Sequence, residues 1–306
     1  MSGLDQAVED YLRTRRALGF KLARHGRLLP ALAHFLDQAG AATLTTHLAL
    51  AWASLPTEHP EECAHRLSIA RGFARYLQTL DAHTEVPPAD LLPRHRRRAS
   101  PYLYSDADVI ALMAATSTLR FPFRSATYCT LIGLLAVTGM RVGEAISLDR
   151  DDLDWTHQCL TIRAGKFGAS RQLPLHPSTI AALASYAQLC DQRWPRAKTP
   201  FFVSLVGARL LYENVHWTFC RLVRHVGLHP QTPSRRPRIH DLRHTFAVNT
   251  VVEWYRSGVD VAAWLPRLST YLGHAAPAWT YWYLSATPEL LALAAARLEQ
   301  DRREPR

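Results

Sequence analysis

The stretch SATYCTLIGLLAVTGMRVGE, residues 125–144, carries the clearest structural signal in this sequence of 306 residues. The part before Gly139 is apolar on nearly every face of a helix, which predicts a buried helix with Cys129 in the core. Gly139 is expected to end this helix, because glycine adopts the left-handed conformation without steric cost. Arg141 would then begin a short helix, with Glu144 on the same face. The pair is either a phosphate-binding arginine held by a carboxylate or an ordinary surface ion pair.

Further along the chain, the pattern changes from helical to extended. Residues 159–163 (CLTIR) and 171–175 (RQLPL) predict two paired strands, joined by a connection at 164–170 that contains two glycines. Lys166 would lie at the tip of this hairpin, where a flexible ammonium could reach a DNA groove or a leaving oxygen. Lysines at hairpin tips usually have no such role, so spacing alone is a weak argument for this residue.

The first ninety residues predict a small bundle of short helices. Apolar residues recur at helical spacing over residues 4–18, 26–40 and 67–77. No catalytic set is recognisable here, and we expect a domain at residues 1–88 that lies along DNA through a basic face. Residues 89–101 are rich in proline and arginine, which predicts a linker.

The remaining residues, 102–306, are expected to form a second domain of mixed α+β type. Ser105, with an acidic residue three positions later, predicts the start of a helix. From residue 177 the pattern is helical to the end, with a frayed charged tail at 300–306. The predicted fold is therefore mainly α, with a helical bundle at the amino terminus and a small β-hairpin or sheet in the second domain.

The charge balance indicates a polyanionic partner. The net charge is +10 and the pI is near 9.7, with more arginine than lysine. Arginine binds phosphate in a bidentate manner, and release of counterions favours association with DNA. The alternative for the charge is a basic surface that binds no such partner. The alternative for residues 89–101 is a solvated connector without a role in binding. The candidate DNA-binding residues are Arg94, Arg96, Arg97, Arg98, Arg235, Arg236 and Arg238.

The sequence argues against secretion, membrane insertion and a metal site. No apolar run approaches the roughly 20 residues of a membrane span, and the amino terminus lacks the layout of a signal peptide. We therefore expect a cytoplasmic protein. The five cysteines are widely spaced without a Cys-x-x-Cys motif, which makes a disulfide framework or a zinc site improbable. No cofactor is expected.

Two further groups of polar residues follow the hairpin. His240 and Arg243 are three apart and would lie side by side on a helix, in a strongly basic neighbourhood. The alternative is a solvated basic loop. His274 has three tyrosines near it, at positions 271, 281 and 283. Tyr281 and Tyr283 would point about 200° apart on a helix, but nothing physical in the sequence selects one of the three as a nucleophile.

Taken together, four segments resemble the tyrosine recombinase (phage integrase) family. They are TGMRVGE at 138–144, the Gly165-Lys166 hairpin, HDLRHTFA at 240–247, and LGH at 272–274 followed by Tyr283. They occur in the family's order over residues 102–290. The resemblance places the nucleophile nine residues after His274, which selects Tyr283, and Thr280 matches a threonine that commonly precedes it. The amino-terminal bundle is similar to the family's core-binding, SAM-like domain.

The resemblance implies a site-specific recombinase or integrase that acts on double-stranded DNA. The catalytic residues would be Arg141, Lys166, His240, Arg243, His274 and Tyr283, with Glu144 in support. Tyr283 would attack the scissile phosphate to give a 3′-phosphotyrosyl enzyme and a free 5′-hydroxyl, without metal or ATP. The family also implies a homotetramer on paired sites, acting by itself or with a partner recombinase.

Two other functions are alternatives to a recombinase, and one segment departs from the family pattern. A type IB topoisomerase uses similar chemistry, and a DNA-binding accessory protein could retain the residues without activity. Compared with commoner family members, the chain is a few residues longer around Trp264–Leu268, which could alter the delivery of Tyr283. That feature and the segment around Tyr283 resemble recombinases carried by bacterial transposons and integrated elements.

Overall fold

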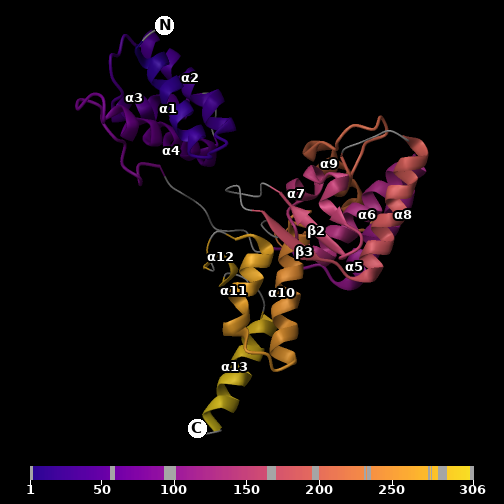
Figure 1. Ribbon diagram of the computed structural model, residues 1–306. Helices are drawn as coiled ribbons and strands as arrows, with labels where there is room; N and C mark the ends of the chain where they lie inside the picture. The colour runs from indigo at the N-terminus through magenta and orange to yellow at the C-terminus, as the bar shows by residue number, and fades with distance from the viewer. Residues whose placement is uncertain are drawn as a thin grey trace. The chain divides into compact units, whose positions relative to one another are not determined.

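The computed structural model describes residues 3–55, 59–92, 101–163, 170–194, 200–230, 232, 236–274, 276, 278–281 and 288–303. The chain divides into two compact units, Met1–Arg98 and Ala99–Arg306, each with its own hydrophobic core (Figure 1). Among the described residues, no helix is both long and apolar enough to cross a membrane.

The amino-terminal unit is a helical bundle, as predicted. Its described residues form α1 (Gly3–Ala17), α2 (Ala23–Gln38), α3 (Thr46–Ser54) and α4 (Pro60–Leu77). Leucines of α2 pack with Phe73 of α4 and Trp52 of α3, all of them almost fully buried. Helix α3 was not predicted, because its nine residues are too short for a clear periodic pattern. It is defined instead by its cap, since the Thr45 side chain accepts a hydrogen bond from the Leu48 amide.

The second unit is mainly helical with one small sheet. Its helices are α5 (Asp106–Ala115), α6 (Pro122–Thr138), α7 (Val142–Ser147), α8 (Pro177–Arg193), α9 (Tyr212–His225), α10 (Asp241–Arg256), α11 (Val261–Leu272), α12 (Ala278–Tyr281) and α13 (Pro288–Arg303), with 3-10 turns at Thr116–Thr118 and Arg150–Asp152. The predicted start of α5 is confirmed, because Ser105 and Asp108 form a reciprocal capping box.

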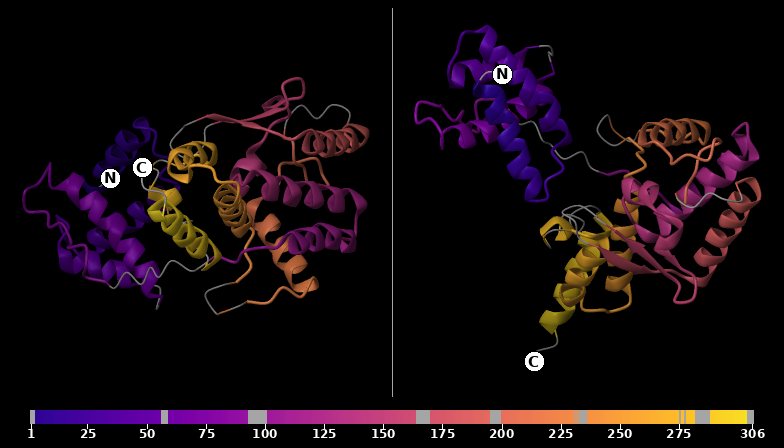
Figure 2. Two further views of the ribbon diagram at one scale, coloured as in Figure 1. Left: turned by 90° about the horizontal axis from the view of Figure 1, so that it is seen from below. Right: turned by 45° about the horizontal axis from the view of Figure 1, so that its top comes forward.

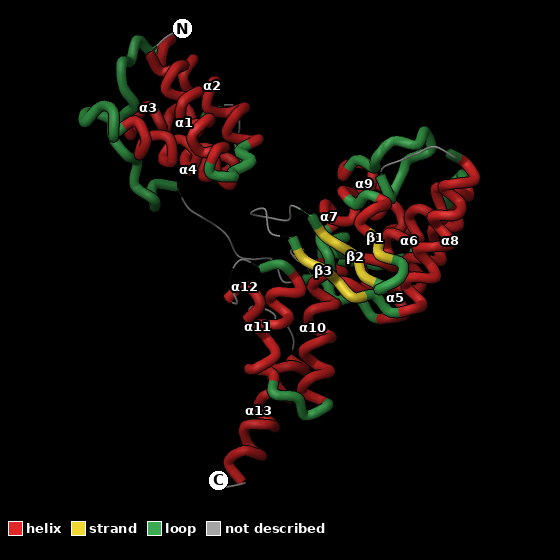
Figure 3. The backbone as a smooth tube through the Cα atoms, viewed as in Figure 1, coloured by secondary structure: helices red, strands yellow, loops and turns green. Residues whose placement is uncertain are grey.

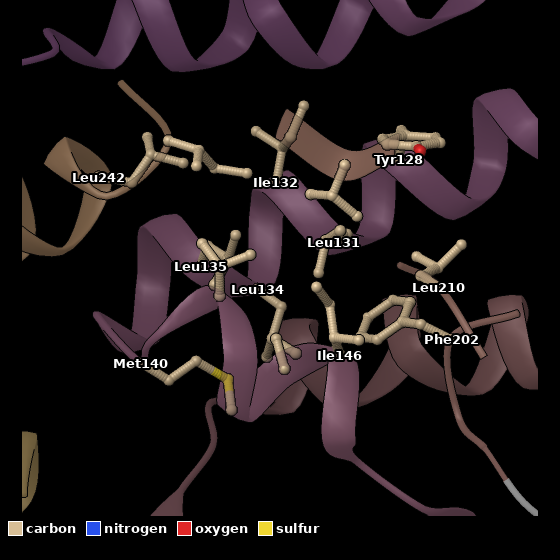
Figure 4. Packing of buried hydrophobic residues seen from close by; sticks show 14 of the residues in the cluster. Tyr128, Leu131, Ile132, Leu134, Leu135, Met140, Ile146, Phe202, Leu210 and Leu242 are labelled. Atoms are coloured by element: carbon tan, nitrogen blue, oxygen red, sulfur yellow. The ribbon is translucent and has the colours of Figure 1, made fainter. Parts of the chain in front are cut away.

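Helix α6 is the centre of the core of this unit. Leu131, Leu134 and Leu135 are at most 2% exposed and lie among side chains from several other elements (Figure 4). The helix begins three residues before the predicted start, because Pro122 suits the first turn of a helix. The prediction that Cys129 is a core residue is wrong, since this side chain is only partly buried.

Gly139 ends α6, as predicted, with a φ of +59°. A Cβ atom at this position would lie 2.4 Å from Cδ1 of Phe246, so no other residue fits without displacing the Phe246 side chain of α10. The glycine therefore serves two purposes: it turns the chain toward Arg141 and lets α10 approach the end of α6.

The hairpin prediction is confirmed and extended by a third strand. Strands β1 (Leu153–Asp154), β2 (Cys159–Ile162) and β3 (Arg171–Pro174) form an antiparallel sheet in the order β1-β2-β3, with Leu160 opposite Leu173 (Figure 3). The strand β1 was missed because it has only two residues.

Two predictions for the carboxyl-terminal part need correction. The chain is not helical throughout after residue 177, because Val203 and Arg209 form an isolated antiparallel bridge. The tail expected to fray from residue 300 is helical to Arg303, where α13 ends; the last three residues lie outside the described part.

Helices α10, α11 and α13 share a separate apolar cluster, which includes Val251, Leu268 and Leu290. In both views of Figure 2, α13, in yellow, lies beside the orange α10. Residues Trp264–Leu268 form part of α11, where Trp264 packs against Trp254 at a centroid distance of 5.7 Å. Helix α11 ends at Gly273, whose φ is +66°, one residue before His274.

Candidate active site

Three arginines converge on the carboxyl-terminal end of α11. They come from different elements: Arg141 precedes α7, Arg171 lies in β3 and Arg243 lies in α10. Each donates to a different carbonyl at N···O distances of 2.7, 2.6 and 2.9 Å, namely Arg171 to Tyr271, Arg243 to Leu272 and Arg141 to Gly273. The last carbonyls of a helix lack partners within the helix and carry partial negative charge, so guanidinium groups stabilise them. The helix end thus fixes the positions of the guanidinium groups.

Glu144 joins two of these arginines. Its Oε1 accepts from Nη1 of Arg141 at 2.7 Å, and its Oε2 accepts from the Arg141 amide at 2.9 Å. Arg171 donates to both carboxylate oxygens, at 3.2 and 2.8 Å. Burial alone would raise the pKa of Glu144, but the hydrogen bonds from Arg171 and Arg141 outweigh it and hold this pKa below its usual value. The predicted Arg141–Glu144 pair is present, and it is a partly buried triad rather than a surface pair.

The sequence interpretation missed Arg171. A signal for it exists, because Arg171 lies on the same face of β3 as the fully buried Leu173, and a charge at an inward position of a strand is unusual. The residue was treated as ordinary hairpin sequence.

His240 and Arg243 lie at the start of α10. Arg243 is only 2% exposed, and its Nη1 donates to the carbonyl of Gly139 at 2.8 Å. His240 keeps part of its surface exposed. The surrounding protein atoms and then the positive charges of Arg243, Arg238 and Arg141 lower the pKa of His240 to about 4. The imidazole is therefore neutral at neutral pH and can accept a proton.

Arg238 was predicted to contact DNA, but much of its hydrogen-bonding capacity is used within the protein. Its backbone amide, Nε and Nη2 all donate to Asp241, which is fully buried. Burial raises the pKa of Asp241, and the hydrogen bonds from Arg238 oppose that effect. Arg238 therefore fixes the start of α10, while its side chain remains 44% exposed.

His274 is held from the other side by α12. Its Nδ1 lies 2.8 Å from Oγ1 of Thr280, a side chain with no exposed surface. Two of the three candidate tyrosines are described. Tyr271 stacks on Phe246 and its burial raises its pKa, whereas Tyr281 is 52% exposed.

Several predicted site residues lie outside the described part of the chain. They are Arg94, Arg96, Arg97, Arg98, Lys166, Arg235 and Tyr283. The structure brings together Arg141, Glu144, His240 and Arg243, and places His274 directly after the helix end they surround. Arg236 is exposed.

Metal ligation is not evident in the described residues. They contain no group of three or more His, Cys, Asp or Glu side chains that could hold a metal ion. The five cysteines are all free thiols, as predicted. The guanidinium groups of Arg141 and Arg243 can bind an anion such as a phosphate, and the neutral imidazole of His240 beside them can accept a proton.

Comparisons with known proteins agree with this chemistry. The sequence profile of the phage integrase family matches residues 104–289. Two proteins of Sinorhizobium fredii (strain NGR234) that carry the name integrase/recombinase are similar over nearly their whole length. One, y4rB, is 45% identical over 98% of both chains, and the other, y4rE, is 36% identical over 97% of this chain and 96% of its own.

Solved structures share the fold at low sequence identity. The XerH site-specific recombinase bound to palindromic difH substrate has a TM-score of 0.64, with 18% identity over 89% of this chain and 78% of that chain. The Tn1549 transposon integrase in complex with a circular intermediate DNA also has a TM-score of 0.64, with 16% identity over 97% of this chain and all of the other. The similarity supports the predicted mainly helical fold with a small sheet.

Proposed function

This chain belongs to the phage integrase family of tyrosine recombinases, and from that premise we propose that it cleaves and rejoins double-stranded DNA through a covalent bond to Tyr283. The observation that carries the proposal is the convergence of Arg141, His240 and Arg243 at the end of α11, one residue before His274. Such a cluster binds a phosphodiester and can accept a proton from an attacking phenol.

The two arginines would bind the non-bridging oxygens of the scissile phosphate. Negative charge on these oxygens increases in the transition state, and donors held in advance stabilise it without reorganisation. Glu144 and the carbonyl of Gly273 hold Arg141 in one orientation. The carbonyls of Leu272 and Gly139 hold Arg243.

Proton transfer completes the reaction. The Tyr283 oxygen forms a bond to phosphorus while its proton passes to His240, and the bond from phosphorus to the 5′-oxygen breaks. Lys166 would protonate that oxygen, and His274 would donate a hydrogen bond to the phosphate. A phenol has an ordinary pKa of about 10, so a neutral base beside it accelerates its attack.

The covalent bond conserves the energy of the phosphodiester, so rejoining needs no ATP. The guanidinium groups supply the positive charge that a metal ion supplies in other phosphoryl-transfer enzymes.

DNA would be held by both units. The basic residues at 94–98 and at 235–238 are the proposed backbone contacts, with Arg238 contributing only the part of its guanidinium group not bound to Asp241. A lambda integrase tetramer has been solved on a Holliday junction. We propose a similar homotetramer on paired sites for this chain.

The test is a covalent adduct formed without metal or ATP. We expect duplex fragments that tile the DNA on both sides of the coding sequence to yield a protein–DNA adduct stable to detergent, in EDTA and without nucleotide. Sequencing the cleaved ends would show protein on the 3′ side. An adduct that requires Mg²⁺ or ATP, or fragments that bind without any adduct, would contradict the mechanism. Relaxation of a supercoiled plasmid without the recognised site would indicate a topoisomerase instead.

We expect the cleavage rate to fall on acidification only at a pH well below 6.5. His240 must be neutral to accept a proton, and its pKa is lowered to about 4 from the ordinary value of 6.5. At limiting DNA, the cleavage rate should therefore hold constant as pH falls from 7 to 6 and decline only towards the lowered pKa. Single-turnover cleavage at constant ionic strength measures this, with His240→Gln, expected to be about 10²-fold slower, as the control. A half-maximal rate at or above pH 6.5 would contradict the lowered pKa of His240, and an acid limb that is unchanged in His240→Gln would exclude His240 as its source.

A further inference from the structure

We propose that Arg171 is a positioning residue for cleavage, which takes up part of the negative charge of Glu144 so that Arg141 keeps its positive charge for the phosphate. The inference rests on the proposed function. It concerns a residue whose side chain is 10% exposed, compared with 26% for Arg141. Arg141 is thus the member of the triad that can reach a bound phosphate, and Arg171 acts through Glu144.

The contacts of Arg171 use all three of its guanidinium nitrogens. Nη1 and Nη2 donate to the two oxygens of Glu144, and Nε donates to the carbonyl of Tyr271. A planar guanidinium matches a carboxylate in this bidentate arrangement, whereas a lysine ammonium does not. Arg171 therefore fixes both the orientation of the carboxylate and its distance from the end of α11.

The charge balance gives Arg171 its effect. Glu144 carries one negative charge and lies within hydrogen-bond distance of two positive groups, so the triad has a net charge of +1. Without Arg171, the carboxylate would pair with Arg141 alone and neutralise it. The attraction between Arg141 and a phosphate would fall, because opposite charges a few ångströms apart at a partly buried site interact strongly.

The turn that follows α11 is shaped around the same side chain. A Cβ atom at Gly273 would lie 2.6 Å from Nη1 of Arg171, and the φ of this residue is +66°. Only glycine allows the guanidinium group to lie against the turn that leads to His274. In the sequence, Arg171 lies five positions after Lys166. Arg171 thus links the hairpin, Glu144 and the segment that carries His274.

The test compares two substrates that differ at the scissile position. One is the ordinary phosphodiester, and the other carries a methyl group in place of one non-bridging oxygen, which makes the linkage neutral. We expect Arg171→Gln to slow single-turnover cleavage of the phosphodiester by roughly 10- to 100-fold, less than loss of a direct donor would. DNA affinity should change by no more than a few fold. On the neutral linkage, the difference in rate between Arg171→Gln and the unaltered protein should shrink markedly, because one of the two non-bridging oxygens and its charge are absent.

Two further variants separate charge from structure. Glu144→Gln combined with Arg171→Gln removes both charges and should recover part of the lost rate, whereas Arg171→Lys should recover part of it without the bidentate contact. Arg209→Gln is the matched control, because Arg209 also binds a carboxylate, that of Asp149, and the carbonyls of Ile146 and Leu148. It should affect both substrates equally.

The outcomes distinguish this inference from the proposed function. If the unaltered protein forms no adduct, the proposed function fails. If the unaltered protein forms the adduct, two results would show that only the inference about Arg171 is wrong. Arg171→Gln would then cleave the phosphodiester as fast as the unaltered protein, or it would be slowed equally on both linkages. If Arg171→Gln does not fold, the comparison of the two linkages is made with Arg171→Lys.

Discussion

Replacing Tyr283 with phenylalanine is expected to abolish the covalent protein–DNA adduct and leave DNA binding unchanged. The substitution removes one oxygen, the atom proposed to attack phosphorus, and keeps the aromatic ring. Because the phenol oxygen itself forms the covalent bond, cleavage should fall to background rather than to a reduced rate. Detergent-stable adduct and equilibrium DNA binding are measured on the same fragment.

The two other tyrosines near His274 serve as controls. Tyr281→Phe should keep the adduct, although Tyr281 is exposed and lies only two residues from Tyr283. Tyr271→Phe should also keep it, because the Tyr271 ring stacks on Phe246 and burial raises the pKa of its phenol, which disfavours attack. An adduct that persists in Tyr283→Phe and disappears in one of these variants would move the assignment to that tyrosine.

Elements governed by local sequence were predictable. The buried helix before Gly139 and the capping box of Ser105 both depend on residues within one or two turns of each other. The pairing of β2 with β3 follows from a short connection between two apolar runs. The positions of Arg141 and Glu144 at the start of α7 could be predicted for the same reason.

Contacts between distant segments were not predictable from local patterns. The carbonyls at the end of α11 lie 29 to 132 positions away from the arginines that bind them. Nothing in the sequence near Arg171 indicates that it shares Glu144 with Arg141. This arrangement depends on the packing of α11 against β3 and of α10 against α6 and α11, and Gly139 allows the close approach of α10 to the end of α6.

The choice among tyrosines shows a different limit. Helical geometry separates Tyr281 from Tyr283 but does not say which faces the site, and only the resemblance to the recombinase family selects Tyr283. The spacing between His274 and Tyr283 is a property of the family, so it assigns the nucleophile only by resemblance. The three phenylalanine variants test that assignment directly.

Arg141 is the better of the two arginines for testing phosphate stabilisation. Arg243 is almost fully buried and donates to the carbonyls of Gly139 and Leu272. Removing it would leave buried acceptors unpaired, at a cost of about 1–3 kcal/mol each, so lost stability and lost catalysis would be mixed. Arg141 is more exposed, and Arg171 would still pair with Glu144 in its absence.

Arg141→Ala is therefore expected to slow cleavage by about 10²- to 10³-fold, the effect of losing one donor to a developing negative charge. Binding should weaken far less, because most affinity for DNA comes from other phosphate contacts. Arg141→Lys should recover only a small part of the rate, since an ammonium lacks the planar, forked donors with which a guanidinium binds phosphate oxygens and Glu144 at the same time. On a neutral methyl-substituted linkage the loss in Arg141→Ala should shrink markedly. A loss of equal size on both linkages would mean that Arg141 supports the fold of the site rather than the charge of the transition state.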